Sequence, residues 1–200
     1  MKPTAGTSVL DLGSGWGDPL VARIAERVPL EVTLADVSEG PLEDGASRGF
    51  RAVVLKEGEP LPFKPNQFDI VLSNSVIEHV TMSPDECRTL SLSEREWRRH
   101  AIANQRRFAN EIRRVGKRYF VQTPHKHFPI DLHLWLPGTN WLPHDIVRRM
   151  VPWLDKHWIK KAGVADWHLL GPREMGDLFP DAEIAVARLL GVPKSVIAYR

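Results

Sequence analysis

The segment VLDLGSGWGDPL, residues 9–20, constrains the fold more than any other part of the sequence. The apolar run that opens it predicts a short buried strand over residues 8–12, and Asp18 and Pro19 suit the N-cap and first position of a following helix. Between strand and helix stand three glycines at alternate positions: Gly13, Gly15 and Gly17. A strand, a glycine-rich turn and a helix in this order are typical of α/β folds that bind a nucleotide.

The rest of the chain continues the alternation of strands and helices. Further strands are predicted at residues 30–36, 51–55, 68–75 and 115–124, with a terminal strand pair at 182–191 and 194–200. A charged stretch over residues 90–115 repeats apolar side chains at helical spacing, which predicts an amphipathic helix that is broken at most once. This alternation favours a doubly wound, mostly parallel α/β sheet with helices on both faces, whose ligands bind beyond the carboxyl ends of the strands.

Composition narrows the class of protein. Residues 1–200 suit a single domain, and 27 basic against 25 acidic side chains leave a formal charge of only +2, so no nucleic-acid partner is expected. The single cysteine, Cys87, excludes an intrachain disulfide, and no apolar run reaches the roughly 18 residues of a membrane span. With no secretory signal before residue 9, the expected compartment is the cytoplasm.

The glycine spacing discriminates between nucleotide cofactors. A dinucleotide site takes Gly-x-Gly-x-x-Gly, but the position of its third glycine is here Asp18, an acid that would repel a pyrophosphate at the helix start. S-adenosylmethionine has no phosphate and carries cationic groups that suit carboxylates. Asp11 is placed to meet its ammonium, and Asp36, at the end of the second strand, to accept both ribose hydroxyls. An NAD-dependent oxidoreductase is therefore the less favoured alternative.

Five segments in chain order resemble the class I S-adenosylmethionine-dependent methyltransferases of the type 11 kind. They are VLDLGSGWG, LAD, EGEPLPFKPNQFDIVLSNSVIEHV, EIRRVGKRYFVQTP and, more weakly, LFPDAEIAVARLLGVPKSVIAYR. The resemblance implies a Rossmann-like sheet of seven strands whose last strand is antiparallel, S-adenosylmethionine as cofactor, and enzymatic methyl transfer. A non-catalytic S-adenosylmethionine-binding or partner module remains an alternative, because related enzymes commonly carry a few dozen residues ahead of the first strand, which here begins at about residue 8.

The resemblance also assigns roles to residues of the cofactor site. Glu57 aligns with the acid that caps the adenine amino group, and Gly58 can donate its backbone N–H to the ring. Asn74 and Ser75 are expected to line the methyl-transfer face. The full expected cofactor-binding set is Asp11, Gly13, Ser14, Gly15, Gly17, Asp36, Val37, Glu57, Gly58, Asn74 and Ser75.

Two regions are expected on the acceptor side: the charged helical region 81–114 and the Trp- and His-rich insertion 124–170. The aromatic content of the insertion suits a small molecule, a glycan or a lipid-linked intermediate as acceptor, and a peripheral membrane contact is compatible with it. His79, from the Glu-His pair of the resemblance, and His133, in the insertion, are the candidate catalytic bases or acceptor contacts. The alternative for both is a histidine that only packs or forms structural hydrogen bonds.

The insertion also contains four possible metal ligands, namely His125, His127, Asp131 and His133. Their spacing matches no zinc signature and methyl transfer rarely needs a metal, so no metal ion is expected. In the arginine-rich stretch 95–114, interleaved acids favour a solvated helix face over a surface for RNA or anionic lipid. Nothing in the sequence marks Cys87 as an activated nucleophile.

Overall fold

The structure of the chain is a computed structural model, which describes residues 3–200 except 14, 16, 84–85, 88–91 and 159–164. The elements in chain order are β1 (Ser8–Leu12), α1 (Pro19–Ala25), β2 (Glu31–Asp36), α2 (Glu39–Ser47), β3 (Arg51–Val54), β4 (Phe68–Asn74), the 3-10 helix η1 (Ile77–His79), α4 (Glu94–Val115), β5 (Gly116–Pro124), the 3-10 helix η2 (Thr139–Trp141), α5 (His144–His157), α6 (Pro172–Leu178), β6 (Glu183–Leu189) and β7 (Val192–Tyr199).

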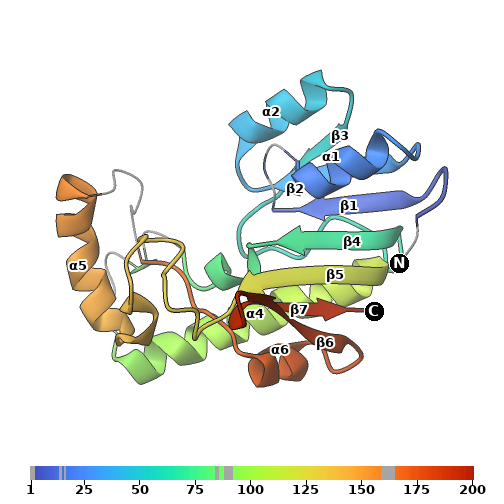
Figure 1. Ribbon diagram of the computed structural model, residues 1–200. Coiled ribbons are helices and arrows are strands. Elements are labelled where there is room, and N and C mark those ends of the chain that lie inside the picture. The colour runs from blue at the N-terminus through green and yellow to red at the C-terminus, as the bar shows by residue number, and fades with distance from the viewer. Residues whose placement is uncertain (1–2, 14, 16, 84–85, 88–91, 159–164) are drawn as a thin grey trace.

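A seven-stranded sheet forms the centre of the fold, in the order β3-β2-β1-β4-β5-β7-β6 (Figure 1). The pairs β1–β2, β2–β3, β1–β4 and β4–β5 are parallel, whereas β7 is antiparallel to both of its neighbours. The chain runs outward from β1 to β3 and then returns to β4, so the strand order reverses between β1 and β4. The predicted fold class, including the antiparallel last strand, is confirmed, and the reversal marks the edge where ligands bind in such sheets.

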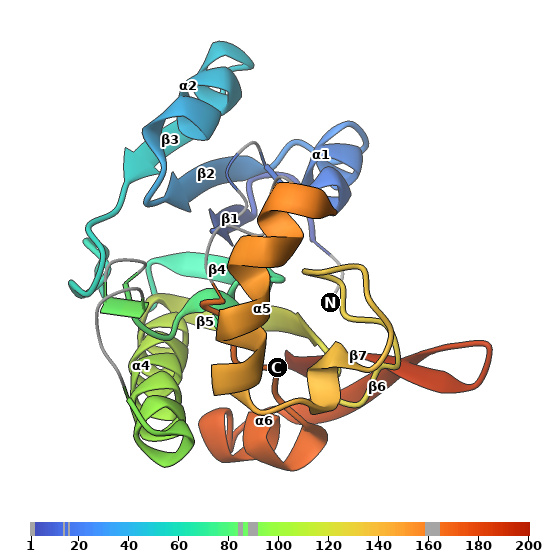
Figure 2. The ribbon, with the colours of Figure 1, turned by 90° about the vertical axis from the view of Figure 1, so that its left-hand side faces the viewer.

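Side chains that alternate along the buried strands attach helices to both faces of the sheet. On β1, Val9 belongs to a core with Val21 of α1 and Leu42 of α2. The next residue, Leu10, points to the opposite face and shares a core with Ile112 of α4. Figure 2 views the sheet from its carboxyl edge and shows α1 and α2 on one side and α4 and α6 on the other. The sheet is therefore doubly wound.

The amphipathic helix predicted over residues 90–115 is a single unbroken element that begins at Glu94; residues 90 and 91 lie outside the described residues. A capping box fixes its start. The backbone N–H of Glu96 donates to the Ser93 hydroxyl at 3.4 Å, and the Ser93 N–H donates to the Glu96 carboxylate at 3.0 Å. The sequence allowed one break in this helix, but the structure shows no break between Glu94 and Val115.

The insertion 124–170 lies over the carboxyl edge of the sheet and has a small core of its own, formed by Leu134, Val147, Val151, Leu154, Ala165 and Trp167. In both Figure 1 and Figure 2, its helix α5 stands beyond the carboxyl ends of β4 and β5. The insertion therefore covers the edge at which the strand ends meet.

Within the residues that the structure describes, no helix is long and apolar enough to cross a membrane.

Candidate functional site

The glycine turn after β1 has a backbone that only glycine adopts easily. Gly13, Gly15 and Gly17 have φ values of +82°, +61° and +94°, in the left-handed region. The Gly13 N–H donates to the Ala35 carbonyl at 2.8 Å, and a Cβ on Gly13 would stand 2.5 Å from Cγ1 of Val76. At Gly13 the turn therefore packs too closely against Val76 to admit a side chain. Ser14, expected in the cofactor site, lies outside the described residues.

Three polar side chains connect this turn to α1 and β4. The buried Asp11 carboxylate accepts the Asp18 backbone N–H at 2.6 Å, and Asn74 donates its side-chain N–H to the Asp18 carboxylate at 2.8 Å. The Asp18 carbonyl accepts the N–H of Ala22, which confirms Asp18 at the N-cap position of α1. Asp11 thus holds the turn in place, and its contact with a cofactor ammonium stays a prediction.

Asp36, at the end of β2, reaches the glycine turn directly. Its Oδ2 accepts the Gly15 N–H at 2.9 Å, and its Oδ1 accepts the Ser38 N–H at 2.9 Å. A carboxylate oxygen has two lone pairs, so each oxygen retains capacity for one more donor, such as a hydroxyl. Val37 follows with 56% of its surface exposed. The end of β2 therefore offers a carboxylate and an apolar side chain at one place.

The remaining residues expected around the cofactor lie after β3 and β4. Glu57 and Gly58 are exposed in a turn that follows Leu55, whose N–H donates to the Asp36 carbonyl at 2.8 Å. Ser75 has a left-handed φ of +56°. This backbone conformation is unfavourable for a residue other than glycine and persists only where surrounding contacts stabilise it. Those contacts come from Gln122 of β5, which accepts both the Ser75 N–H at 2.9 Å and the Ser75 hydroxyl at 3.1 Å. The described members of the set lie along one edge of the sheet.

The two candidate histidines, which are 54 positions apart in the sequence, meet at this edge. The ring of His79, in η1, lies edge-to-face against the ring of His133 with 5.0 Å between centroids. His133 also stacks on Trp167 at 4.5 Å. His79 Nδ1 is 3.0 Å from Oδ1 of Asp166, and His133 Nδ1 is 3.2 Å from Oδ1 of Asp131. Each histidine is therefore oriented by a carboxylate, as expected of a functional histidine.

Glu78 completes this cluster, although it was not among the site residues predicted from the sequence. Its side chain is fully buried, and Oε2 accepts the Thr123 hydroxyl at 2.9 Å. Burial raises the pKa of Glu78. Burial alone would lower the pKa of His79, but the hydrogen bond and charge of Asp166, with the charge of Glu78, outweigh it and raise that pKa. The only signal in the sequence was the Glu-His pair after a strand.

Among the described residues, Glu78, His79 and His133 are the one set of three acidic, histidine or cysteine side chains close enough to share a metal ion. The set considered from the sequence, His125 and His127 with Asp131 and His133, is not gathered in this way. His125 instead accepts the His127 backbone N–H at 3.0 Å, and burial lowers its pKa. The candidate ligands that lie close together in the structure therefore come from two segments that are distant in the sequence, and not from the single segment considered first.

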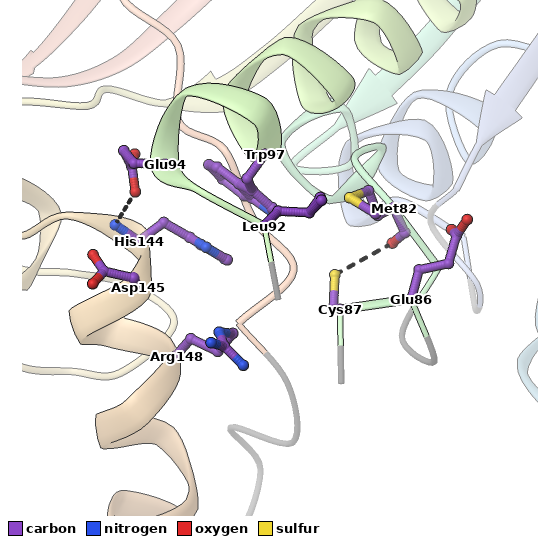
Figure 3. Close-up of a pocket in the computed structure, with 9 residues that line it drawn as sticks. All are labelled: Met82, Glu86, Cys87, Leu92, Glu94, Trp97, His144, Asp145 and Arg148. Atoms are coloured by element: carbon purple, nitrogen blue, oxygen red, sulfur yellow. Dashed lines mark hydrogen bonds between the residues drawn. The ribbon is translucent and has the colours of Figure 1, made fainter. Parts of the chain in front are cut away.

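A separate hollow lies between the start of α4 and α5 (Figure 3), lined by Met82, Glu86, Cys87, Leu92, Glu94, Trp97, His144, Asp145 and Arg148. Trp97 stacks on the His144 ring at 3.6 Å, and Glu94 accepts the His144 backbone N–H at 2.7 Å. Burial raises the pKa of the Cys87 thiol to about 11, so the thiolate nucleophile is scarce at neutral pH. These contacts join α4 to the insertion.

A family of known proteins and several solved structures are similar to this chain. A family model described as a methyltransferase domain matches residues 10–119. No curated protein matches the sequence. A solved S-adenosylmethionine dependent methyltransferase from Mesorhizobium loti is 16% identical, with a TM-score of 0.61 over 100% of this chain and 92% of that chain.

Two further structures show the same fold at low identity. A SAM dependent methyltransferase from Aquifex aeolicus is 19% identical, with a TM-score of 0.52 over 98% of this chain and 82% of that chain. A geranyl diphosphate C-methyltransferase from Streptomyces coelicolor A3(2), solved with Mg2+, geranyl diphosphate and S-adenosyl-L-homocysteine, is 13% identical, with a TM-score of 0.55 over 98% of this chain and 74% of that chain.

Proposed function

Because the chain belongs to the family of methyltransferase domains, whose model matches residues 10–119, we propose that it uses the carboxyl edge of β1 to β4 to hold S-adenosylmethionine beside an acceptor under the insertion 124–170. The activity is S-adenosylmethionine-dependent methyl transfer. The observation that carries the placement of the cofactor is the glycine turn, whose left-handed backbone at Gly15 is bonded by the Asp36 carboxylate.

The residues present fit this cofactor. The turn leaves no room for a Cβ at Gly13, as expected where the backbone packs closely, and carboxylates stand on both sides of it at Asp11 and Asp36. Negative charge of this kind favours a cationic, phosphate-free ligand over a pyrophosphate. When bound, S-adenosylmethionine supplies a methyl group on a positively charged sulfur. Asp36 would orient the ribose, while Asn74 and Ser75 would border the methyl group.

We infer that the acceptor carries an apolar or sugar-like part. The support is the insertion, in which four tryptophans are 60–66% exposed: Trp135, Trp141, Trp153 and Trp158. Large exposed aromatic side chains are costly in water and commonly mark a surface that binds apolar or glycan ligands. A similar fold bound to geranyl diphosphate supports an acceptor of this kind. Small molecules, glycans and lipid-linked intermediates all satisfy this description.

In this arrangement the donor is already activated, so the protein contributes mainly by positioning the two reactants and excluding water. A protonated acceptor also needs a base. His79 and His133 are proposed for this role, because each ring is oriented by a carboxylate at the same edge as Ser75. The insertion supplies His133 and would limit access of water to the acceptor.

Calorimetric titration with S-adenosylmethionine, S-adenosylhomocysteine and NAD tests the placement of the cofactor. Asp36→Ala removes charge-assisted hydrogen bonds worth about 1.5–3 kcal/mol each, so affinity for both adenosyl ligands should fall by roughly 10- to 150-fold for each bond lost. Asp44→Ala is the matched control, because Asp44 is an exposed acid on α2. Its side chain forms an ion pair with Arg48, which is also exposed.

Two results would contradict the proposal. Unchanged affinity in Asp36→Ala, or an equal loss in Asp44→Ala, would remove Asp36 from the cofactor site. Binding of NAD in preference to both adenosyl ligands would overturn the cofactor itself.

A further inference from the structure

Glu78, His79 and His133 form a compact set of metal-ligand side chains at the carboxyl edge of the sheet. One ligand atom of each lies within 4.8 Å of the others. Glu78 and His79 come from η1, a few residues after β4, and His133 comes from the insertion. Since this proximity depends on tertiary folding, it is a property of the site and not of a local sequence motif.

In both imidazoles one ring nitrogen, Nδ1, lies next to a carboxylate. A carboxylate only accepts hydrogen bonds, so Asp166 and Asp131 each require a proton on the Nδ1 of their histidine. The remaining ring nitrogen, Nε2, then carries a lone pair. A histidine with one nitrogen bonded to a carboxylate and the other available is the usual arrangement of a metal-ligating histidine.

The carboxylate partner of His133 is itself firmly held. Asp131 is 1% exposed, and its Oδ1 also accepts the backbone N–H groups of His133 at 2.7 Å and Leu134 at 3.2 Å. The His133 ring is stacked on Trp167, which restricts its rotation. The ligand is thus preorganised, which reduces the conformational entropy lost when an ion binds.

Glu78 supplies an oxygen that the described residues leave without a hydrogen-bond partner. Its Oε2 is bonded to Thr123, but its Oε1 is buried and accepts no hydrogen bond from any described residue. A buried carboxylate oxygen without a partner is costly. A cation beside it would satisfy this oxygen, and Glu78 is the third residue of the set.

We propose that Glu78, His79 and His133 bind one divalent transition-metal ion, of which zinc is the simplest case. Two imidazole nitrogens and one carboxylate oxygen suit zinc and its neighbours, whereas magnesium and calcium prefer oxygen ligands alone. Bonds of about 2.1 Å hold tetrahedral ligands about 3.4 Å apart, so ligand atoms that now lie within 4.8 Å of one another have to approach by up to about 1.4 Å around the ion. His79, whose side chain is 40% exposed, has the freedom to make this movement.

The position of the site indicates what the ion would bind. Three protein ligands leave at least one coordination position open, and an open position takes water or an oxygen of a small molecule. Resting on the proposed methyl transfer, that oxygen would belong to the acceptor: a hydroxyl, phenol or phosphate group. A metal ion lowers the pKa of a bound hydroxyl and so prepares it for reaction at neutral pH. With the ion bound, this activation takes the place of direct proton removal by His79 or His133, because a coordinated imidazole nitrogen has no free lone pair.

Metal titration of the tag-free protein, stripped with a chelator and without S-adenosylmethionine, tests the site. Calorimetry with zinc chloride should give one ion per chain with micromolar or tighter affinity, and magnesium or calcium chloride should give at least 100-fold weaker binding. His133→Ala should weaken zinc binding by 100-fold or more. His127→Ala removes an exposed histidine of the same insertion that lies outside the set, so its affinity should equal that of the unmodified chain.

Two further variants separate a built site from accidental chelation and from misfolding. Asp166→Ala should weaken zinc binding 10- to 100-fold, because it removes only the group that orients His79. Glu78→Gln keeps the shape of the buried side chain and should weaken zinc binding to a similar or greater extent while the circular dichroism of the metal-free protein is unchanged. Millimolar zinc affinity, or affinity that survives His133→Ala, would overturn the metal site. Since no readout uses the cofactor, failure of the proposed methyl transfer would leave this result intact.

Discussion

Replacing Gly13 with alanine probes the glycine turn at the position where the structure permits a Cβ least. Two costs arise. Alanine at a φ of +82° costs about 1–2 kcal/mol, because the left-handed backbone brings Cβ close to the carbonyl oxygen. The new Cβ would also stand 2.5 Å and 2.7 Å from the two methyl carbons of Val76, about 1 Å inside normal carbon–carbon contact, which adds roughly 1–3 kcal/mol.

Gly6→Ala isolates the backbone cost. Gly6 has a similar φ of +77°, but a Cβ there would have nothing within 4 Å. Gly6→Ala should therefore lose about 1–2 kcal/mol of unfolding free energy and Gly13→Ala about 2–5 kcal/mol, measured by urea denaturation. The difference corresponds to a melting temperature lower by roughly 2–4 °C for each kcal/mol.

The double variant Gly13→Ala/Val76→Ala tests whether the clash is the cause. Removing the Val76 methyl groups should recover most of the difference between the two single glycine variants, as a coupling energy in a double-mutant cycle. Affinity for S-adenosylmethionine should fall in Gly13→Ala and stay unchanged in Gly6→Ala. If Gly13→Ala is no less stable than Gly6→Ala, or if the double variant recovers nothing, the close packing of this turn is refuted.

Two other predictions concern the stability of the scaffold. Ser93→Ala removes the capping box with Glu96 and should lower the unfolding free energy by about 1 kcal/mol in thermal or urea denaturation; an unchanged value would show that α4 does not depend on this cap. Hydrogen bonds from Lys117 and Ser8 lower the pKa of Asp69 to about 2, so its stabilising effect is complete above pH 4 and is lost as the pH falls from about 4 through 2. Asp69→Asn should therefore lose less stability than the unmodified chain between pH 4 and pH 2, and parallel curves would contradict this.

The sheet could be predicted because its signals are local. Each strand of the parallel region is a short apolar run that stops at a polar or turn residue, and the glycine turn identifies the first crossover. The length of α4 was harder to predict. Its apolar side chains serve two separate cores, with Trp97 in a small cluster beside Met82 and Cys87, and Ile112 in the core under the sheet. Because these two apolar patches face different cores, the spacing of apolar residues along the sequence resembles that of two helices separated by a break.

The sheet edge that we propose for the cofactor could also be predicted from the sequence. The carboxyl ends of parallel strands meet at one edge, so residues after β1, β2 and β4 are brought together by topology alone. The hydrogen bonds between residues at that edge could not be predicted from the sequence. That Asp36 accepts the Gly15 N–H and Asn74 donates to Asp18 depends on strand register and on the path of the turn, which no local pattern specifies.

The sequence by itself determined the order of the strands, the glycine turn with the acids beside it, and the helices that follow the first and fourth strands, because these depend on residues that are neighbours in the chain. Only the tertiary structure decided that His79 meets His133 and that the buried Glu78 lies within reach of both. Their meeting depends on how the insertion packs over the sheet edge through its own core and through the stacking of His133 on Trp167. Contacts between segments so far apart are fixed by the packing of whole surfaces, which the spacing of a few residues does not encode.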